Sequence, residues 1–110
     1  MTKPTHSARE IAAAVTAGRM TAVDTAKAAL GRIDAAKALN AVVTTDPART
    51  LADAAAVDDR LRAGKTMPLA GVPILVKDNI WASGWRITQG SRLFADFIAP
   101  GLIVMAMIQN

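Results

Sequence analysis

Cysteine is absent from the 110 residues of this chain, and histidine occurs once, as His6. The absence of cysteine excludes a disulfide framework, a thiolate metal site and a cysteine nucleophile. A single histidine cannot build a zinc site, and a Ser-His pair would require the N-terminus to fold back onto the core. We therefore expect His6 to be a surface residue and expect no metal site.

Aromatic residues and long apolar runs are also scarce. Only 4% of the residues are aromatic, although 52% are hydrophobic, because much of the apolar content is alanine. Alanine buries little surface, so the expected core is thin. The longest apolar run, residues 101–108, is far below the roughly 20 residues that span a bilayer. No secretory signal pattern is present, so a cytoplasmic protein without membrane contact is the expectation.

The positive net charge is not concentrated in any one stretch. The chain has 13 Lys and Arg against 9 Asp and Glu, a formal net charge of +4. Because no run of five like charges occurs, a solvated surface explains the spread better than a nucleic-acid footprint. Asp58 and Asp59 are also expected on a solvated helix face, since adjacent helical residues diverge by about 100° and cannot share a site.

Three amphipathic helices are predicted by capping residues and by apolar residues at helical spacing. Ser7 and Thr21 each precede an acidic residue by three positions, which is typical of a capping box. Asp46-Pro47 is a favoured pair at a helix start. The predicted helices begin after Ser7, Thr21 and Asp46 and end near Gly18, Asn40 and Ala63. Their expected inward faces comprise Ala8, Ile11, Ala12 and Val15; Val23, Ala26, Leu30 and Ile33; and Leu51, Ala54, Val57 and Leu61.

Two short apolar segments are predicted to be β-strands. Residues 41–45 are rich in β-branched side chains. Residues 74–76 have no polar alternation, which suits a strand that is covered on both faces. A further short element is expected between residues 93 and 98. The alternation of helices and strands predicts an α/β fold. Because two strands do not make a stable sheet, we expect N-terminal helices plus the first strands of a larger mixed-sheet fold, incomplete in this chain.

Lys77 follows residues 74–76 and is the candidate catalytic residue. A lysine in this position usually extends into solvent. Burial would make a neutral amine available as a base near pH 7. Ser83 and Ser91, in glycine-flanked loops, are the candidate nucleophiles, but their spacing does not require them to approach Lys77. The residues alone therefore leave a surface role and a catalytic role of Lys77 open.

Trp81 and Trp85 also have two interpretations. They form either a binding surface or, as is commoner for loop tryptophans, a cover over a core. The glycines near them do not form a phosphate-binding pattern.

Residues 68–80, PLAGVPILVKDNI, closely resemble the segment of the amidase signature family that carries its catalytic lysine. Upstream, residues 21–33 and 39–47 are similar to a helix and a strand of that family. Downstream, residues 84–94 and 96–100 most resemble one branch of the family, the A subunits of glutamyl-tRNA(Gln) amidotransferase. The resemblance covers residues 7–100, whereas residues 101–110 form a divergent tail. We therefore expect residues 1–110 to be the N-terminal portion of a single amidase domain, shortened by truncation or a frameshift.

The resemblance implies a Ser-cis-Ser-Lys triad in which Lys77 helps to deprotonate a serine that attacks a carboxamide. The family places both triad serines in a downstream motif that this chain lacks, and neither Ser83 nor Ser91 matches them. Ile87 stands where a threonine is usual. The resemblance further implies glutamine as the amide donor, other amidotransferase subunits and, indirectly, Glu-tRNA(Gln) as partners, and no cofactor.

Three hypotheses follow for function. The first is an amidase-family segment that is inactive alone, because a base without its nucleophile cannot form an acyl-enzyme. The second is a non-catalytic interaction module that binds partner subunits, and the third is a fragment of a general carboxamide amidase. RNA binding ranks below these, and no direct contact with DNA is expected. An incomplete fold also predicts marginal stability, with apolar faces of residues 74–76 and 102–108 exposed.

Overall fold

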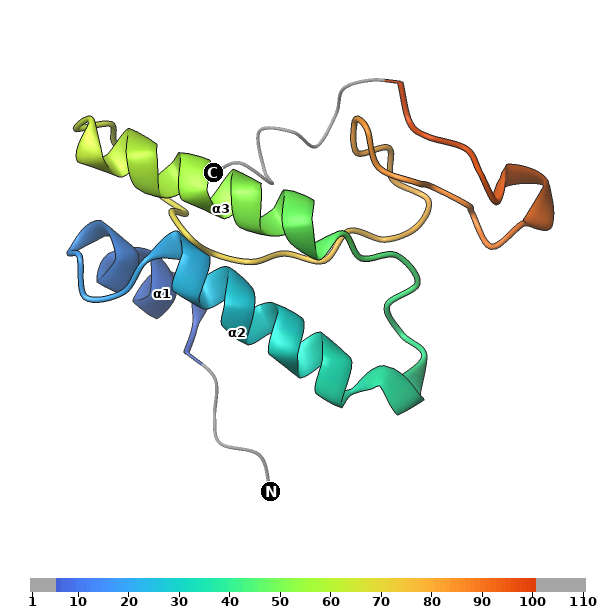
Figure 1. The fold of residues 1–110 in the computed structure, drawn as a ribbon, viewed down its shortest axis with the longest axis horizontal. Coiled ribbons are helices and arrows are strands. Elements are labelled where there is room, and N and C mark those ends of the chain that lie inside the picture. Colours follow the sequence, from blue (N-terminus) through green and yellow to red (C-terminus); the bar gives the residue numbers. More distant parts are fainter. Residues whose placement is uncertain (1–5, 101–110) are drawn as a thin grey trace.

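Helices and turns make up the fold of this chain, as described for residues 6–100 by a computed structural model (Figure 1). The helices are α1 (Ala8–Thr16), α2 (Ala22–Ala35) and α3 (Pro47–Arg62), with short 3-10 turns η1 (Lys37–Leu39) and η2 (Arg92–Phe94). The expectation for residues 102–108 lies outside the described residues. No helix within residues 6–100 combines the length and the apolar character needed to cross a membrane.

The predicted helix starts are confirmed by their capping hydrogen bonds. Ser7 and Thr21 both form capping boxes, and Pro47 occupies the first turn of α3. Gly18 adopts a left-handed conformation (φ +79°) after α1, as predicted. Amide groups donate from Glu10 to Ser7 Oγ (3.1 Å), from Asp24 to Thr21 Oγ1 (3.0 Å) and from Arg49 to Asp46 Oδ1 (3.1 Å).

The second helix ends earlier than predicted. The α-helical part stops at Ala35, and η1 carries the chain to Leu39. Asn40 then adopts a left-handed conformation (φ 51°), so the end of the helical segment lies where it was predicted. None of the residues of η1 is buried, so no packing against the core holds this stretch in a longer α-helix.

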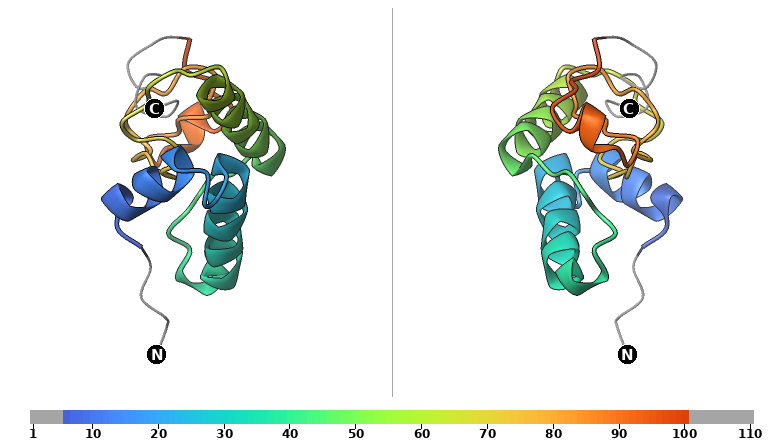
Figure 2. Two further views of the ribbon diagram at one scale, coloured as in Figure 1. Left: turned by 90° about the vertical axis from the view of Figure 1, so that its left-hand side faces the viewer. Right: turned by 90° about the vertical axis from the view of Figure 1, so that its right-hand side faces the viewer.

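A small core forms where the three helices meet the segment that follows α3. Residues 65–72 run beneath α3 in Figure 1, and Figure 2 shows α1 and α2 on the same side of this segment. The core is thin, as expected, because it is built mainly from alanine and valine. Its buried members are Val15, Ala22, Ala26, Ala54, Val57, Met67 and Ala70. Ile11, Val23, Leu51 and Leu61 of the predicted inward faces pack against it, whereas Ala8 is exposed.

Gly71 closes the turn that brings residues 67–70 into this core. It has a φ of +74°, and a Cβ at this position would lie 2.7 Å from Val15 Cγ2. Thr25, which is buried in α2, donates its hydroxyl to the Gly71 carbonyl (2.5 Å) and also lies 2.9 Å from the Ala22 carbonyl. Glycine is therefore required both by the backbone angle and by the close approach of α1.

The prediction for Asp58 was wrong. Asp58 is half-buried, and its carboxylate accepts hydrogen bonds from the amides of Ala22 (2.7 Å) and Val23 (3.2 Å) at the start of α2. Asp59, one position later, is exposed as expected, and it pairs with Arg62. Because the two carboxylates diverge on α3, one faces α2 while the other faces solvent.

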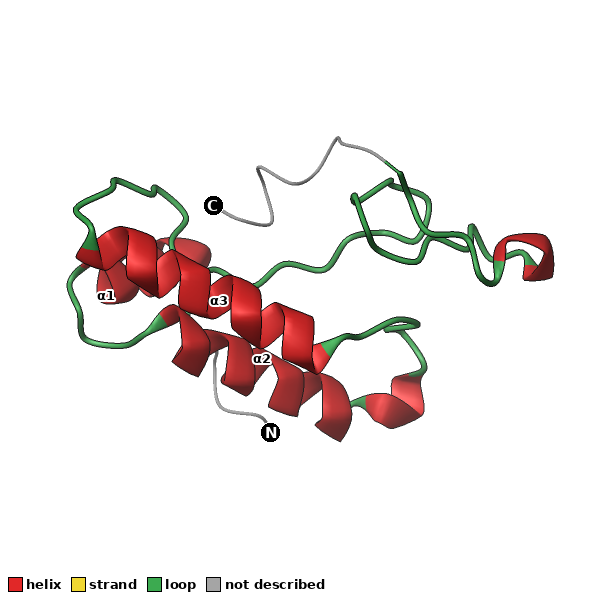
Figure 3. Cartoon of the chain, turned by 45° about the horizontal axis from the view of Figure 1, so that its top comes forward, coloured by secondary structure: helices red, strands yellow, loops and turns green. Residues whose placement is uncertain are grey.

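The two predicted strands are not present among residues 6–100, where Figure 3 shows helices and loops only. Residues 41–45 and 74–76 are irregular. A strand exists only when a neighbouring strand satisfies its backbone groups, and no described segment pairs with either stretch. The predicted sheet of an α/β fold is therefore not observed in the described part of the chain. One antiparallel bridge, between Arg86 and Ile98, is the β-type pairing in the described part of the chain.

The exposed apolar face that was predicted for residues 74–76 is largely confirmed. Ile74 is 41% exposed and Leu75 is 70% exposed, while Val76 is half-buried. These side chains lie on the segment that leads from the helices to the loops of residues 77–100. Those loops form an arm that extends away from the three helices, with η2 near its tip (Figure 3).

Candidate functional site

Lys77 lies at the junction between the helical part and the arm. Its carbonyl accepts a hydrogen bond from the Ile80 amide (3.0 Å), so Lys77 is the first residue of a tight turn. The side chain is exposed. Within residues 6–100 its amine takes part in neither of the two ion pairs. The burial that a lysine base requires is therefore not provided by the described residues.

Asp78 is turned toward the loop at residues 88–90. Its carboxylate accepts hydrogen bonds from the Thr88 amide (2.8 Å) and from the Thr88 hydroxyl. Its carbonyl accepts from the Gln89 amide (3.0 Å). The hydrogen bonds from the Thr88 side chain and backbone hold the pKa of Asp78 below its ordinary value. Three hydrogen bonds thus fix the residue that follows Lys77.

Arg49 attaches the arm to α3. Its guanidinium donates to the carbonyls of Gly84 (2.8 Å) and Ser83 (3.1 Å) and lies over the ring of Trp85, with Cζ 4.6 Å from the ring centroid. A planar guanidinium can make both types of contact at once. The indole nitrogen of Trp85 is buried without a hydrogen-bond partner among the described residues. Sequence reasoning missed Arg49, because a contact across 35 positions leaves no local pattern.

Arg86 makes a second attachment, inside the arm and to the loop before α3. It donates to the Ala95 carbonyl (2.8 Å), and it lies 3.3 Å from Thr44 Oγ1 and 3.4 Å from the Val43 carbonyl. The stretch of residues 41–45 is therefore held by a side chain rather than by a strand ladder. Arg86 was also missed, and it sits beside Ile87, which is buried (4% exposed).

The two candidate serines have structural roles in this geometry. Ser83 offers its carbonyl to Arg49, and the Ser91 hydroxyl accepts from the Leu93 amide (3.2 Å) at the start of η2. Among residues 6–100, neither hydroxyl is hydrogen-bonded to Lys77. The structure therefore does not bring Lys77 and these serines together, in agreement with their mismatch to the amidase triad.

The tryptophans differ in environment. Trp81 is 39% exposed and its ring lies 5.3 Å from that of Phe97, which in turn lies 5.9 Å from Phe94. Trp85 is half-buried beneath Arg49. Trp85 therefore packs against Arg49 of α3, whereas Trp81 belongs to an aromatic cluster of the arm.

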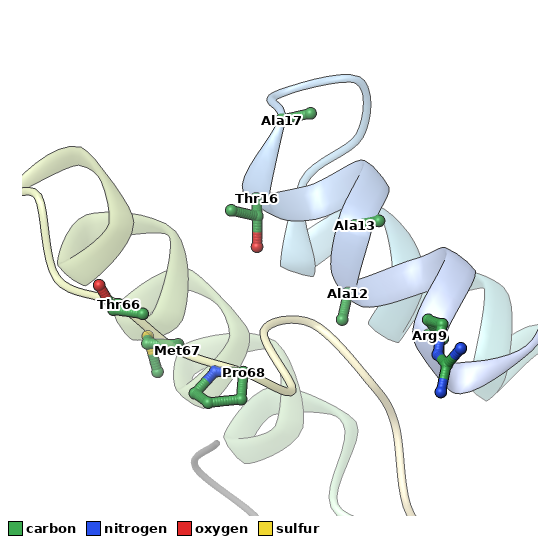
Figure 4. A pocket seen from close by; sticks show the side chains of 8 residues that line it. All are labelled: Arg9, Ala12, Ala13, Thr16, Ala17, Thr66, Met67 and Pro68. Carbon is green, nitrogen blue, oxygen red and sulfur yellow. The ribbon is translucent and has the colours of Figure 1, made fainter.

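A hollow of about 440 Å³ lies in the helical part of the molecule, between α1 and residues 66–68 (Figure 4). Arg9 is the charged residue of its lining, and Lys77 does not border it. The remaining lining residues are Ala12, Ala13, Thr16, Ala17, Thr66, Met67 and Pro68. This hollow carries no acid–base pair. No group of three His, Cys, Asp or Glu suited to a metal is found within residues 6–100.

Comparison with known proteins gives a family match and several relatives. The family model described as Amidase matches residues 24–108, a range that includes Lys77. The A subunit of glutamyl-tRNA(Gln) amidotransferase from Paraburkholderia phytofirmans is 44% identical over 105 residues, covering 94% of this chain and 21% of the relative. The proteins of the same name from Cupriavidus metallidurans and Deinococcus radiodurans are each 45% identical, covering 86% of this chain and 19% and 20% of their own lengths. The chain thus spans about a fifth of these relatives and matches their N-terminal part.

Proposed function

Because the chain belongs to the amidase family, we propose that it carries the catalytic lysine of an amidase site of the glutamyl-tRNA(Gln) amidotransferase type. We further propose that the chain releases no ammonia on its own. The observation that carries this proposal is the family match across residues 24–108, together with 45% identity to two of the named amidotransferase proteins. In this proposal Lys77 is the base, and glutamine is the amide donor.

The chemistry assigned to Lys77 is proton transfer. A neutral lysine amine accepts a proton from a serine held in a cis peptide, which in turn accepts the proton of the nucleophilic serine. The serine oxygen attacks the carboxamide carbon, and the amide nitrogen takes up the proton given by the serine and leaves as ammonia. Water later hydrolyses the acyl-serine. The released ammonia would serve amidation of Glu-tRNA(Gln) by other amidotransferase subunits.

The geometry explains why the chain alone should be inactive. A lysine amine in water is almost fully protonated at neutral pH and needs desolvation to act as a base. Lys77 is exposed, the Ser91 hydroxyl accepts from the Leu93 amide, and within residues 6–100 neither the Ser83 nor the Ser91 hydroxyl is hydrogen-bonded to Lys77. An exposed lysine with no serine hydroxyl hydrogen-bonded to it cannot start acyl transfer.

The test compares the chain alone with a chimera. Purified chain and its Lys77→Ala variant are incubated with glutamine, and we expect no difference in ammonia release. Residues 7–100 then replace the matching segment of the Deinococcus radiodurans relative. We expect the chimera to release ammonia and Lys77→Ala to lower its rate by about 10²-fold or more, while Lys65→Ala, at an exposed lysine, has no such effect.

Two outcomes would contradict the proposal. Lys77-dependent ammonia release by the chain alone would show that it holds its own nucleophile. An active chimera that tolerates Lys77→Ala would show that this lysine is not the base. Activity of the chimera on simple carboxamides but not on glutamine would favour a general carboxamide amidase.

The exposed segment before Lys77 favours a second function, a non-catalytic interaction module. The amides of residues 74–77 donate to no acceptor within residues 6–100, and Leu75 is 70% exposed. Such an extended apolar edge suits strand addition to a partner. A stoichiometric partner in a pull-down that Leu75→Pro abolishes would support this function. Binding that survives Leu75→Pro would argue against it.

A further inference from the structure

The hydrogen bonds of Asp78 bear directly on the amine of Lys77. Asp78 and Lys77 are adjacent in the chain, and an exposed lysine beside a free carboxylate can form an ion pair. The carboxylate is instead engaged by the Thr88 amide (2.8 Å) and the Thr88 hydroxyl. Both of these hydrogen bonds come from the 88–90 loop.

Thr88 is itself held in place. Its hydroxyl oxygen accepts a hydrogen bond from the Gly90 amide (3.2 Å) while it donates to Asp78. The Gln89 amide also donates to the Asp78 carbonyl (3.0 Å). Gln89 and Gly90 both adopt positive φ angles, 54° and 71°, which curl the loop back toward Asp78. The loop at residues 88–90 is therefore shaped to receive one carboxylate.

We propose that Thr88 is a positioning residue: it holds the carboxylate of Asp78 away from Lys77, so that the lysine amine stays free to meet its reaction partners. This inference rests on the proposed role of Lys77 as a base. A base that forms an ion pair with a neighbouring carboxylate is stabilised in its protonated form and is less available to accept a proton. Thr88 prevents this by occupying the carboxylate with its hydroxyl and its amide.

The experiment measures the reactivity of Lys77 in the full chain, and so does not depend on amidase activity. The chain is treated briefly with acetic anhydride, and mass spectrometry gives the acetylation rate of Lys77 relative to Lys65, an exposed lysine. Thr88→Val keeps the backbone amide and removes the hydroxyl. We expect the relative rate to fall about two- to threefold in Thr88→Val, the range of an exposed ion pair.

A second substitution separates an electrostatic effect from a structural one. In the double variant Asp78→Asn/Thr88→Val the carboxylate is gone, so we expect the Lys77 rate to return to that of the parent chain. Thr88→Ser keeps the hydroxyl and should leave the rate unchanged. Thr45→Val, at an exposed threonine, is the matched control and should also leave it unchanged.

The proposal is overturned if Thr88→Val leaves the Lys77 rate unchanged, or if the double variant stays as slow as Thr88→Val. The second result would mean that loosening of the loop, not the freed carboxylate, alters Lys77. If the acetylation test fails, a chimera whose activity depends on Lys77 still supports the proposed function. If the chimera test fails, the acetylation result still supports the local arrangement of Asp78 and Lys77.

Discussion

Asp58 in α3 caps Ala22 at the start of α2, with the Ala22 amide donating to its carboxylate over 2.7 Å. The next amide, of Val23, donates to the other carboxylate oxygen (3.2 Å), and that of Asp24 donates to Thr21. The first amides of a helix have no partners within it. Here two of them are satisfied by a side chain from another helix, and the charge of that side chain also complements the dipole of α2.

We therefore expect Asp58→Ala to lower the free energy of unfolding by about 1–2 kcal/mol. The reason is that two part-buried amides lose their acceptor and the contact between α2 and α3 loosens. Asp59→Ala is the matched control, because Asp59 is exposed and pairs with Arg62 on its own helix, and should change the free energy by less than about 0.5 kcal/mol. Urea denaturation, monitored by circular dichroism, gives the free energy of unfolding of the two variants. Equal destabilisation by the two substitutions would contradict the interhelical cap.

Gly71→Ala should be among the most damaging small substitutions. The added Cβ would lie 2.7 Å from Val15 Cγ2, at a backbone φ of +74°. Overpacking and left-handed strain together predict a loss of roughly 2–4 kcal/mol. Gly64→Ala is the control, since φ is +84° but nothing lies within 4 Å of the added atom; it should cost only about 1–2 kcal/mol. The measurement is again urea denaturation, and equal losses would show that the close approach to Val15 is relieved at no cost.

The helices could be predicted from sequence because their determinants are local. Ser7, Thr21 and Asp46 each place an oxygen within reach of an amide three residues later, so four consecutive residues are enough to predict where each helix begins. Most of the inward faces follow from spacing, although Ala8 is exposed. Family membership was equally visible, because the segment around Lys77 is long and specific.

The features that could not be predicted depend on contacts between residues far apart in the chain, which the sequence does not display. Residues 74–76 have the composition of a strand, but a strand also requires a neighbour, and none is present among residues 6–100. Arg49 and Arg86 bind carbonyls that lie 35 and 43 positions away, respectively. Asp58 looked like half of a solvated acidic pair because only the packing of α2 against α3 distinguishes it from Asp59.

Arg49→Lys should detach the arm from α3 without unfolding the helices. A lysine keeps the charge but cannot donate to the carbonyls of Ser83 and Gly84 while it lies flat on Trp85. We expect hydrogen exchange within residues 82–86 to accelerate several-fold in this variant, whereas exchange in α2 and α3 stays unchanged. Arg62→Lys, at an exposed arginine on the same helix, is the control. Faster exchange throughout α3 would mean that Arg49 supports the helix rather than the arm.

Acid should release Asp78 from Thr88. The hydrogen bonds from Thr88 hold the pKa of Asp78 below its ordinary value, so the folded protein favours the ionised carboxylate. The stabilisation is therefore fully present above the ordinary aspartate pKa of about 3.9 and is lost as the pH falls through the lower folded-state value. An NMR titration of the Asp78 carboxyl carbon should show a midpoint below that ordinary value, and Thr88→Val should move the midpoint upward. Thr45→Val should leave it in place. A midpoint at the ordinary value that Thr88→Val does not move would contradict the hydrogen-bonded arrangement, and with it the separation of Asp78 from Lys77.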